Sequence, residues 1–311
     1  MSEVSDGPSP VVGPPLIYGV AAATVVVLGL NWPVMTWGLE TIAPLWLTSL
    51  RLLGAGILLA LVLVPSGGLR RPPRRDYPVV ASVAVIRLAL VYSLVFSALL
   101  LVPPGRSSMV VHTSGLWAAP VAAWLLHERL TTAKVSGLVL GVGGIVLLME
   151  PWRLVIGGGG ALGFAMLLLA AVATAVANVH VRGHRWTSTP LALMPWQLVA
   201  AGLLTTPVAL ALHGPPQVGW TLEVVAVVAY QVLLASGFGV WGILTISRSL
   251  SAASAGAVFM AVPAVGVVSS VLLVGEVLTP AAIGGILLVF GGVWTAVTAD
   301  RDRSAQQVVA A

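Results

Sequence analysis

The 311-residue sequence contains no cysteine, so it can form neither a disulfide bond nor a thiolate metal site. Charge is scarce as well: 8% of the residues are Asp, Glu, Lys or Arg, whereas a soluble domain carries about 25%. A phosphate-binding P-loop pattern is missing, which argues against an ATP-driven pump in this chain. The five histidines show no metal-ligand spacing. We therefore expect no metal, no cofactor and no enzymatic activity.

Apolar residues dominate the chain instead. They make up 58% of the sequence, and the mean hydropathy is +1.03. A hydrocarbon layer about 30 Å thick needs about 20 helical residues per span, and continuous apolar runs favour helices over a β-barrel. The sequence predicts an all-α integral membrane protein with ten transmembrane helices, at about 16–38, 43–65, 78–100, 106–126, 133–150, 160–182, 189–212, 222–245, 251–274 and 279–298.

The net charge of +5 lies in the loops between these segments, which favours a role in membrane topology over nucleic-acid binding. With the N-terminus inside, eleven basic residues fall in cytoplasmic loops and tails: Arg70, Arg71, Arg74, Arg75, Arg129, Lys134, Arg182, Arg185, Arg248, Arg301 and Arg303. Only Arg106 and Arg153 fall in outer loops. This bias predicts a multi-pass protein of the bacterial inner membrane with both termini in the cytoplasm. The first residues lack a basic region, so we do not expect a cleaved signal peptide.

The sequence repeats itself. Residues 44–62 (PLWLTSLRLLGAGILLALV) resemble 190–208 (PLALMPWQLVAAGLLTTPV), and 128–148 resemble 276–296. Each copy holds five predicted helices, and because five is odd the second copy enters the membrane from the opposite side. The expected organisation is a disordered tail (1–15), a first repeat (16–150), a linker (151–159), a second repeat (160–298) and a cytoplasmic tail (299–311).

Several marks carry a family resemblance. They are the run GLNWPVMTWGLE in the first helix, Pro44 with Leu50-Arg51 in the second, and Gly275-Glu276, Gly284-Gly285 and Gly291-Gly292 near the end. Through them, residues 16–298 resemble the drug/metabolite transporter superfamily, specifically its EamA-type ten-helix permeases. One mark departs, since His127 stands where the second repeat has Gly275. The resemblance implies a proton-linked or facilitative carrier of small metabolites; amino-acid exporters are the best-known type, and drug and nucleotide-sugar carriers are relatives.

Two arginines fall inside predicted helices, near mid-depth. A charge within a membrane is costly and is by default a functional-site hypothesis. Arg51 and Arg87 could each bind a substrate carboxylate or phosphate, or bond to backbone carbonyls and neighbouring side chains. The repeat places Gln197 at the position of Arg51, and Gln231 close to that of Arg87.

Other polar and aromatic residues extend the candidate substrate site. Asn31 and Asn178 occupy matching positions and could contact substrate or join helices. Four tryptophans and two tyrosines lie deep enough to line a cavity: Trp32, Trp117, Trp196, Trp241, Tyr92 and Tyr230.

Acidic residues are missing from the middle of the spans. Glu128 and Glu276 lie at helix ends, which predicts solvated or capping roles. His112 is therefore the candidate for proton coupling, with plain hydrogen bonding as its alternative. Because an acidic relay is missing, facilitated diffusion is an alternative to proton coupling.

Glycine and proline complete the pattern. The glycines of 133–150 and 279–298 predict close helix packing within each half, or a dimer face. Pro120 and Pro263 predict kinks in the fourth and ninth helices.

The sequence thus predicts a carrier that exports amino acids or similar small metabolites by alternating access. One alternative is an exporter of amphipathic drugs or a natural product, and another is a membrane accessory protein without transport. The expected partners are a small-molecule substrate and membrane lipid, with no nucleic acid, and the chain is a monomer or a homodimer.

Overall fold

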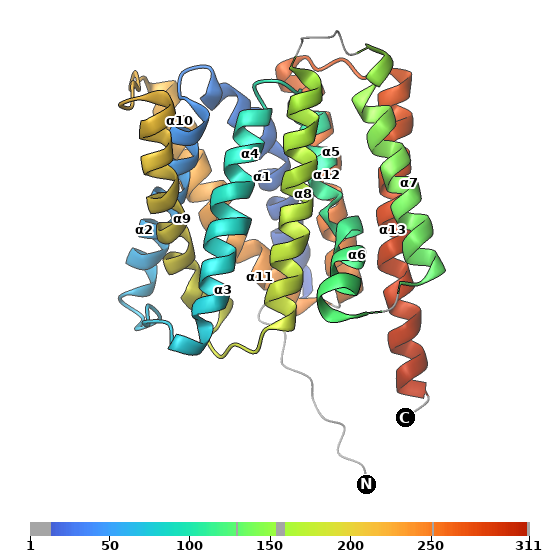
Figure 1. The fold of residues 1–311 in the computed structure, drawn as a ribbon. Coiled ribbons are helices and arrows are strands. Elements are labelled where there is room, and N and C mark those ends of the chain that lie inside the picture. The colour runs from blue at the N-terminus through green and yellow to red at the C-terminus, as the bar shows by residue number, and fades with distance from the viewer. Residues whose placement is uncertain (1–13, 129, 154–158, 251, 310–311) are drawn as a thin grey trace.

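A computed structural model describes residues 14–128, 130–153, 159–250 and 252–309, and all regular elements in these ranges are helical (Figure 1). The elements are α1 (Pro14–Leu39), α2 (Pro44–Leu63), η1 (Arg74–Asp76), α3 (Tyr77–Ser82), η2 (Val83–Leu90), α4 (Val91–Ala98), α5 (Pro104–His112), α6 (Ser114–Leu126), α7 (Thr132–Met149), η3 (Pro151–Arg153), α8 (Gly160–Gly183), α9 (Pro190–His213), α10 (Leu222–Ala229), η4 (Tyr230–Phe238), α11 (Gly239–Ser249), α12 (Ala252–Val274) and α13 (Pro280–Val309).

Within the described residues, nine helical stretches are long and apolar enough to cross a membrane, and Pro280–Thr295 is a shorter apolar one. Three of the nine combine several elements: η1 to α4, α5 with α6, and α10 to α11. All lie near segments predicted from the sequence. The last helix continues beyond the predicted end at residue 298, to Val309. Most of the predicted disordered tail, and the centre of the predicted linker, lie outside the described residues.

The bundle has two ends. We call the end where α1 begins and α13 ends the lower end, and the end where α4 ends and α5 begins the upper end (Figure 1). Proline opens α2, α5, α9 and α13, where its missing N–H removes a donor that has no partner within the helix. Threonine side chains accept a hydrogen bond from the first turn of α7, α9 and α10. The first turns of these helices are therefore well capped, and the loops between the spans are short.

Two spans contain a π-helical stretch at matching points of the two repeats. In the third predicted span it is η2, and in the eighth it is η4. A π-helical stretch widens a helix locally and is frequent at functional sites. The sequence analysis did not anticipate either one.

The two prolines predicted to kink helices both lie inside helices of the structure. The fourth predicted span is interrupted at Thr113, where α5 ends and α6 begins, seven residues before Pro120. The Thr113 hydroxyl donates to the Val110 carbonyl and accepts from Trp117 Nε1, so side-chain bonds hold this break. Pro263 lies inside one continuous helix, α12.

Two antiparallel helix pairs stand at opposite sides of the bundle, α2 with α9 and α7 with α13 (Figure 1). Each pair joins one helix from each half of the chain. Glycine permits the close approach: a Cβ added to Gly144 would lie 2.7 Å from the Gly285 carbonyl oxygen, and one added to Gly292 would lie 2.5 Å from that of Gly137. The prediction of packing within each half, or of a dimer face, is therefore wrong: these glycines pack the two halves together.

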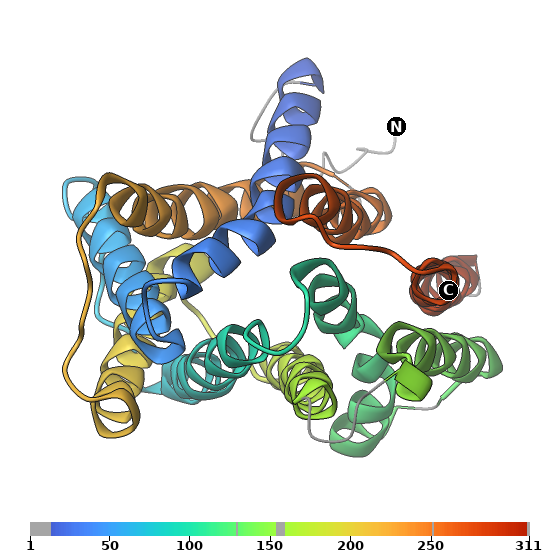
Figure 2. The ribbon, with the colours of Figure 1, turned by 90° about the horizontal axis from the view of Figure 1, so that it is seen from above.

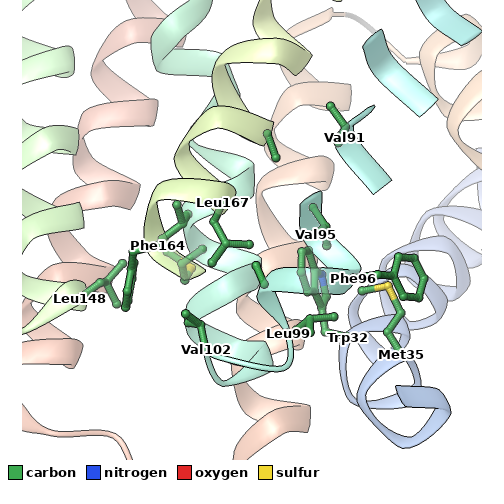
Figure 3. Close-up of a cluster of buried hydrophobic side chains, with 14 of the residues drawn as sticks. Trp32, Met35, Val91, Val95, Phe96, Leu99, Val102, Leu148, Phe164 and Leu167 are labelled. Atoms are coloured by element: carbon green, nitrogen blue, oxygen red, sulfur yellow. The ribbon is translucent and has the colours of Figure 1, made fainter. Parts of the chain in front are cut away.

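The largest apolar core lies among α1, α4, α5, α7 and α8. Figure 3 shows part of it, with Trp32, Met35 and Phe96 grouped on one side and Leu148, Phe164 and Leu167 on the other. Seen from above, the helix pairs flank the remaining helices on two sides (Figure 2). Of the candidate site residues, Arg51, Trp196 and Gln197 lie on the pair of α2 and α9, and the others lie on helices outside the two pairs.

The departure of His127 from the family mark does not change the backbone. His127 has φ 55°, and its counterpart Gly275 has φ 73°, so both helices end in the left-handed conformation. A side chain at such a position is strained by roughly 1–2 kcal/mol, whereas glycine is not.

Replacing His127 with glycine is therefore expected to stabilise the protein by about 1 kcal/mol, because the relief of strain exceeds the added entropy of the unfolded chain. Thermal unfolding in detergent would measure it. The reverse change, Gly275→Ala, has open space around the added Cβ and is expected to destabilise by a similar amount. A lower melting temperature for His127→Gly would contradict this account.

Candidate functional site

Arg51 lies at the centre of a buried polar cluster formed by Met35, Arg51, Tyr92, Gln231 and Ser236, which we call the Arg51 cluster. Its Nη1 donates to Gln231 Oε1 at 2.7 Å and to the Met35 sulfur at 3.7 Å, and its Nε donates to Ser236 Oγ at 3.1 Å. The guanidinium carbon lies 4.6 Å from the centre of the Tyr92 ring. These contacts compensate a buried charge and tie α2 to α1, α4 and η4.

Arg87 differs from Arg51. It lies half-buried on η2, close enough to Tyr92 and His112 to interact with them electrostatically. Among the described residues, no hydrogen bond or ion pair is found for its guanidinium. His112 Nδ1 donates to the Ser108 carbonyl (2.8 Å), and its ring centre lies 6.1 Å from that of Trp32. Arg87 is thus a positive charge inside the bundle, with donors left for another group.

Two amides near the Arg51 cluster have unused bonding capacity. Within the described part of the chain, Gln231 Nε2 and Asn31 Oδ1 are buried without a hydrogen-bond partner. Asn31 Nδ2 donates to the Met35 sulfur at 3.5 Å. Tyr230 is already used, because its hydroxyl donates to the Val27 carbonyl at 2.6 Å. A buried polar atom without a partner is costly, so such atoms are candidates for contact with a ligand or water.

Other predicted site residues lie apart from this cluster. Trp117 donates to Thr113, Gln197 is buried in α9, and Asn178 is exposed on α8. Trp241 is 45% exposed and packs beside Phe238. The expectation that Trp196 lies deep is wrong: its indole is 40% exposed and donates to the Arg70 carbonyl in a loop at the lower end.

A cavity of about 500 Å³ opens between the end of α1 and α10, at the upper end. Its walls are mostly apolar. The lining residues are Val34, Trp37, Gly38, Glu40, Thr41, Glu223, Val224, Ala226, Val227 and Tyr230. Tyr230 is adjacent in sequence to Gln231, so this cavity borders the Arg51 cluster.

The upper end also holds a buried ionic network. Glu276 accepts from the backbone N–H of Gly105 (2.7 Å) and of Arg106 (3.3 Å), and so caps the start of α5. Arg106 Nη2 lies 3.0 Å from Glu150 Oε2, and Arg106 Nε lies 3.8 Å from Glu276 Oε1. Burial raises the pKa of Glu276 above its usual range, and the two N–H bonds and the Arg106 charge partly oppose this. The capping alternative of the sequence analysis is confirmed for Glu276.

At the lower end, the carboxylate of Glu128, which aligns with Glu276 in the sequence repeat, has different surroundings. The Glu128 side chain is 42% exposed, and its Oε1 lies 2.7 Å from Arg182 Nη2 on α8. The two carboxylates that align in the sequence repeat thus have unlike surroundings.

The fold and the sequence both match known proteins. A solved crystal structure superposes with a TM-score of 0.61 at 20% identity, covering 93% of this chain and 99% of the other. The model of the EamA-like transporter family matches residues 16–150 and again 161–298. The chain belongs to the EamA-like transporter family. This family points to a membrane transporter rather than an enzyme.

Curated relatives of this EamA-like transporter are similar over nearly their whole length. A protein named "Probable amino-acid metabolite efflux pump" from Salmonella typhimurium is 26% identical over 93% of this chain and 97% of its own. Its namesake in Escherichia coli is 25% identical, with the same two shares. A "Probable terminal-alkyne amino-acid exporter" from Streptantibioticus cattleyicolor is 28% identical over 87% of this chain and 89% of its own.

Sequence reasoning missed several members of the site. It did not find Met35 and Ser236, the partners of Arg51, because neither is unusual in a membrane helix. The repeat aligns Gln231 with a position close to Arg87, which says nothing of its contacts, and in the structure Gln231 accepts a hydrogen bond from Arg51. The π-helical stretches also leave no recognised signal in the sequence.

Proposed function

We propose that this EamA-like transporter is a secondary carrier of the bacterial inner membrane that exports amino acids or similar small metabolites. Its ten spans would form two inverted five-helix repeats, with both termini and the lower end in the cytoplasm. The charge bias of the loops and the internal repeat support this topology. The names of the Salmonella, E. coli and Streptantibioticus relatives support an amino-acid cargo.

The observation that carries the proposal is the difference between the two arginines. Arg51 is held by Gln231, Ser236 and Tyr92, and so it positions the helices around it. Arg87 keeps its donors and faces Tyr92 and His112 inside the bundle. A guanidinium suits a carboxylate, which every amino acid carries. Arg87 is therefore proposed to bind the substrate carboxylate, and Gln231 Nε2 and Asn31 Oδ1, which lack partners among the described residues, are proposed as further contacts.

The cavity beside Trp37 favours one alternative, an exporter of amphipathic organic cations. Its apolar walls would take an apolar body, and the carboxylates of Glu40 and Glu223 would attract a positive charge. Such a substrate would not need Arg87.

Flux in proteoliposomes would test the proposal. We expect export of particular labelled amino acids from a mixed pool, above that of empty liposomes. If an imposed pH gradient leaves the flux unchanged, the carrier is facilitative; if flux follows the gradient, it is proton-linked and His112 is the residue to replace. Flux of hydrophobic cations without amino-acid flux would support the alternative, and no flux of either would favour an accessory role.

A further inference from the structure

We propose that Glu276 and the first turn of α5 form a gate at the upper end of the bundle, between α5 and the segment that joins α12 to α13, and that this structure is a state with the gate closed. The inference deepens the proposed alternating-access carrier and rests on it. The gate consists of Gly105, Arg106, Glu150 and Glu276. It joins α5 of the first half to the segment between α12 and α13 of the second half.

The contact between Glu276 and α5 leaves no free space. A Cβ added to Gly105 would lie 2.6 Å from Glu276 Oε2, so a side chain at this position would displace the carboxylate. Glu276 is 8% exposed, and its carboxylate faces the N–H groups of α5 and the guanidinium of Arg106. A carboxylate at a helix start is stabilised by the donors and dipole of that helix.

Glu150 supports the gate from a strained position. It ends α7 with φ 45°, a left-handed conformation that a side chain rarely adopts. Its two oxygens face Arg106 and the Thr279 hydroxyl, at 3.0 and 2.8 Å. Backbone strain of this kind persists only where surrounding contacts hold it, and it is frequent in segments that switch.

Pairs of residues that align in the two repeats show that the ends differ. Glu276 is sealed at the upper end, whereas Glu128 is exposed at the lower end. Asn31 is buried in α1, whereas Asn178 is exposed in α8. Asn178 lies seven residues after Ala171, which is fully buried on the same face of α8. Ala177 and Val179, on either side of Asn178, are buried, so the exposure of α8 toward the lower end is that of the Asn178 position.

The helices that meet at the gate separate below it. α5 packs against α12, where a Cβ on Gly266 would lie 2.7 Å from Ser108 Oγ. α6 continues the same span and packs instead against α8. Gly115, seven residues after Ser108, is exposed and has open space around it. In this span α5 is thus packed against α12, whereas α6 is uncovered at Gly115, toward the lower end.

The gate is built to be reversible. The N–H bonds and the Arg106 charge favour the buried carboxylate of Glu276, while its lost hydration opposes burial. A bound substrate that interacts more favourably with the open state would shift the equilibrium toward it.

The lack of cysteine makes the gate directly measurable. Ser108→Cys places a thiol under the gate at a buried hydroxyl that has no partner among the described residues, and Gly115→Cys places one at an exposed position closer to the lower end. We expect a hydrophilic thiol reagent to label Gly115→Cys in detergent at least about tenfold faster than Ser108→Cys. The assay needs no substrate, so failure of the gate and failure of export remain distinguishable.

Variants of the gate then decide the assignment. In the Ser108→Cys background, Glu276→Ala and Gly105→Ala are each expected to speed labelling at least about tenfold, since one removes the carboxylate and the other displaces it. Glu128→Ala is the matched control and is expected to leave labelling unchanged. Equal labelling in all variants, or faster labelling with Glu128→Ala alone, would overturn the proposal. Gly105→Ala keeps every charged residue. It therefore still tests the gate if Glu276→Ala fails to fold.

Discussion

Replacing Arg87 with alanine is expected to leave the protein folded and to slow amino-acid export at least about tenfold, because a hydrogen bond to a charged group contributes about 1.5–3 kcal/mol. Among the described residues nothing bonds to its guanidinium, so its removal breaks no internal contact. Initial export rates from proteoliposomes over a range of substrate concentrations would measure the effect. The loss is expected mainly as weaker binding, since Arg87 is proposed to hold the carboxylate.

Arg51 provides the contrast. Arg51→Ala removes the partner of Gln231, Ser236 and Tyr92 and leaves buried polar atoms unpaired, so it is expected to lower the melting temperature and the yield of folded protein. Arg87→Lys keeps the charge without the fork and is expected to recover part of the export. Wild-type export by Arg87→Ala would contradict the proposed role. If Trp37→Ala also abolished export of hydrophobic cations, the site would lie in the cavity beside α10.

Replacing Gly292 with alanine is expected to destabilise the protein by about 1–3 kcal/mol, the usual cost of overpacking. The added Cβ would contact backbone atoms, which cannot move away as a side chain can. It would lie 2.5 Å from the Gly137 carbonyl oxygen and 2.8 Å from the Gly141 nitrogen. Thermal unfolding in detergent and the yield of monodisperse protein would report the change.

The neighbouring glycine is the control. Gly291 has no atom within 4 Å of an added Cβ, so Gly291→Ala is expected to be neutral or slightly stabilising, because alanine is the better helix former. The first repeat offers the same comparison, with Gly144 in contact and Gly143 in open space. Equal effects of Gly291→Ala and Gly292→Ala would show that helix propensity, rather than the contact with α7, governs stability here.

Much of the helical framework could be predicted, because a membrane span needs a long apolar run and the spans are separated by Pro, Gly and Arg. Which helices pair with each other could not be predicted from the sequence. The glycines of α7 and α13 showed that backbones approach closely, but spacing along one helix does not identify the helix it faces.

The candidate site was predicted as a set of residue types and not as an arrangement. Arg51, Tyr92 and Gln231 were all selected, yet their mutual contact depends on the π-helical stretch η4 and on the placement of α2 beside it. The sequence could not separate Arg51 from Arg87 either, since both are single arginines near mid-depth. Only the partners of each guanidinium distinguish them.

The two flanking helix pairs have a consequence for how the chain is made. α2 and α7 emerge from the ribosome with their glycine-containing faces bare, because their partners belong to the second half. Translation must pass from Leu63, where α2 ends, to His213, where α9 ends, before the first pair can form. At about 5–20 residues per second, this interval lasts roughly 10–30 s. During this interval the first half lies in the translocon or in lipid with these helix faces unpaired. Factors that shield helices during insertion would act on it there.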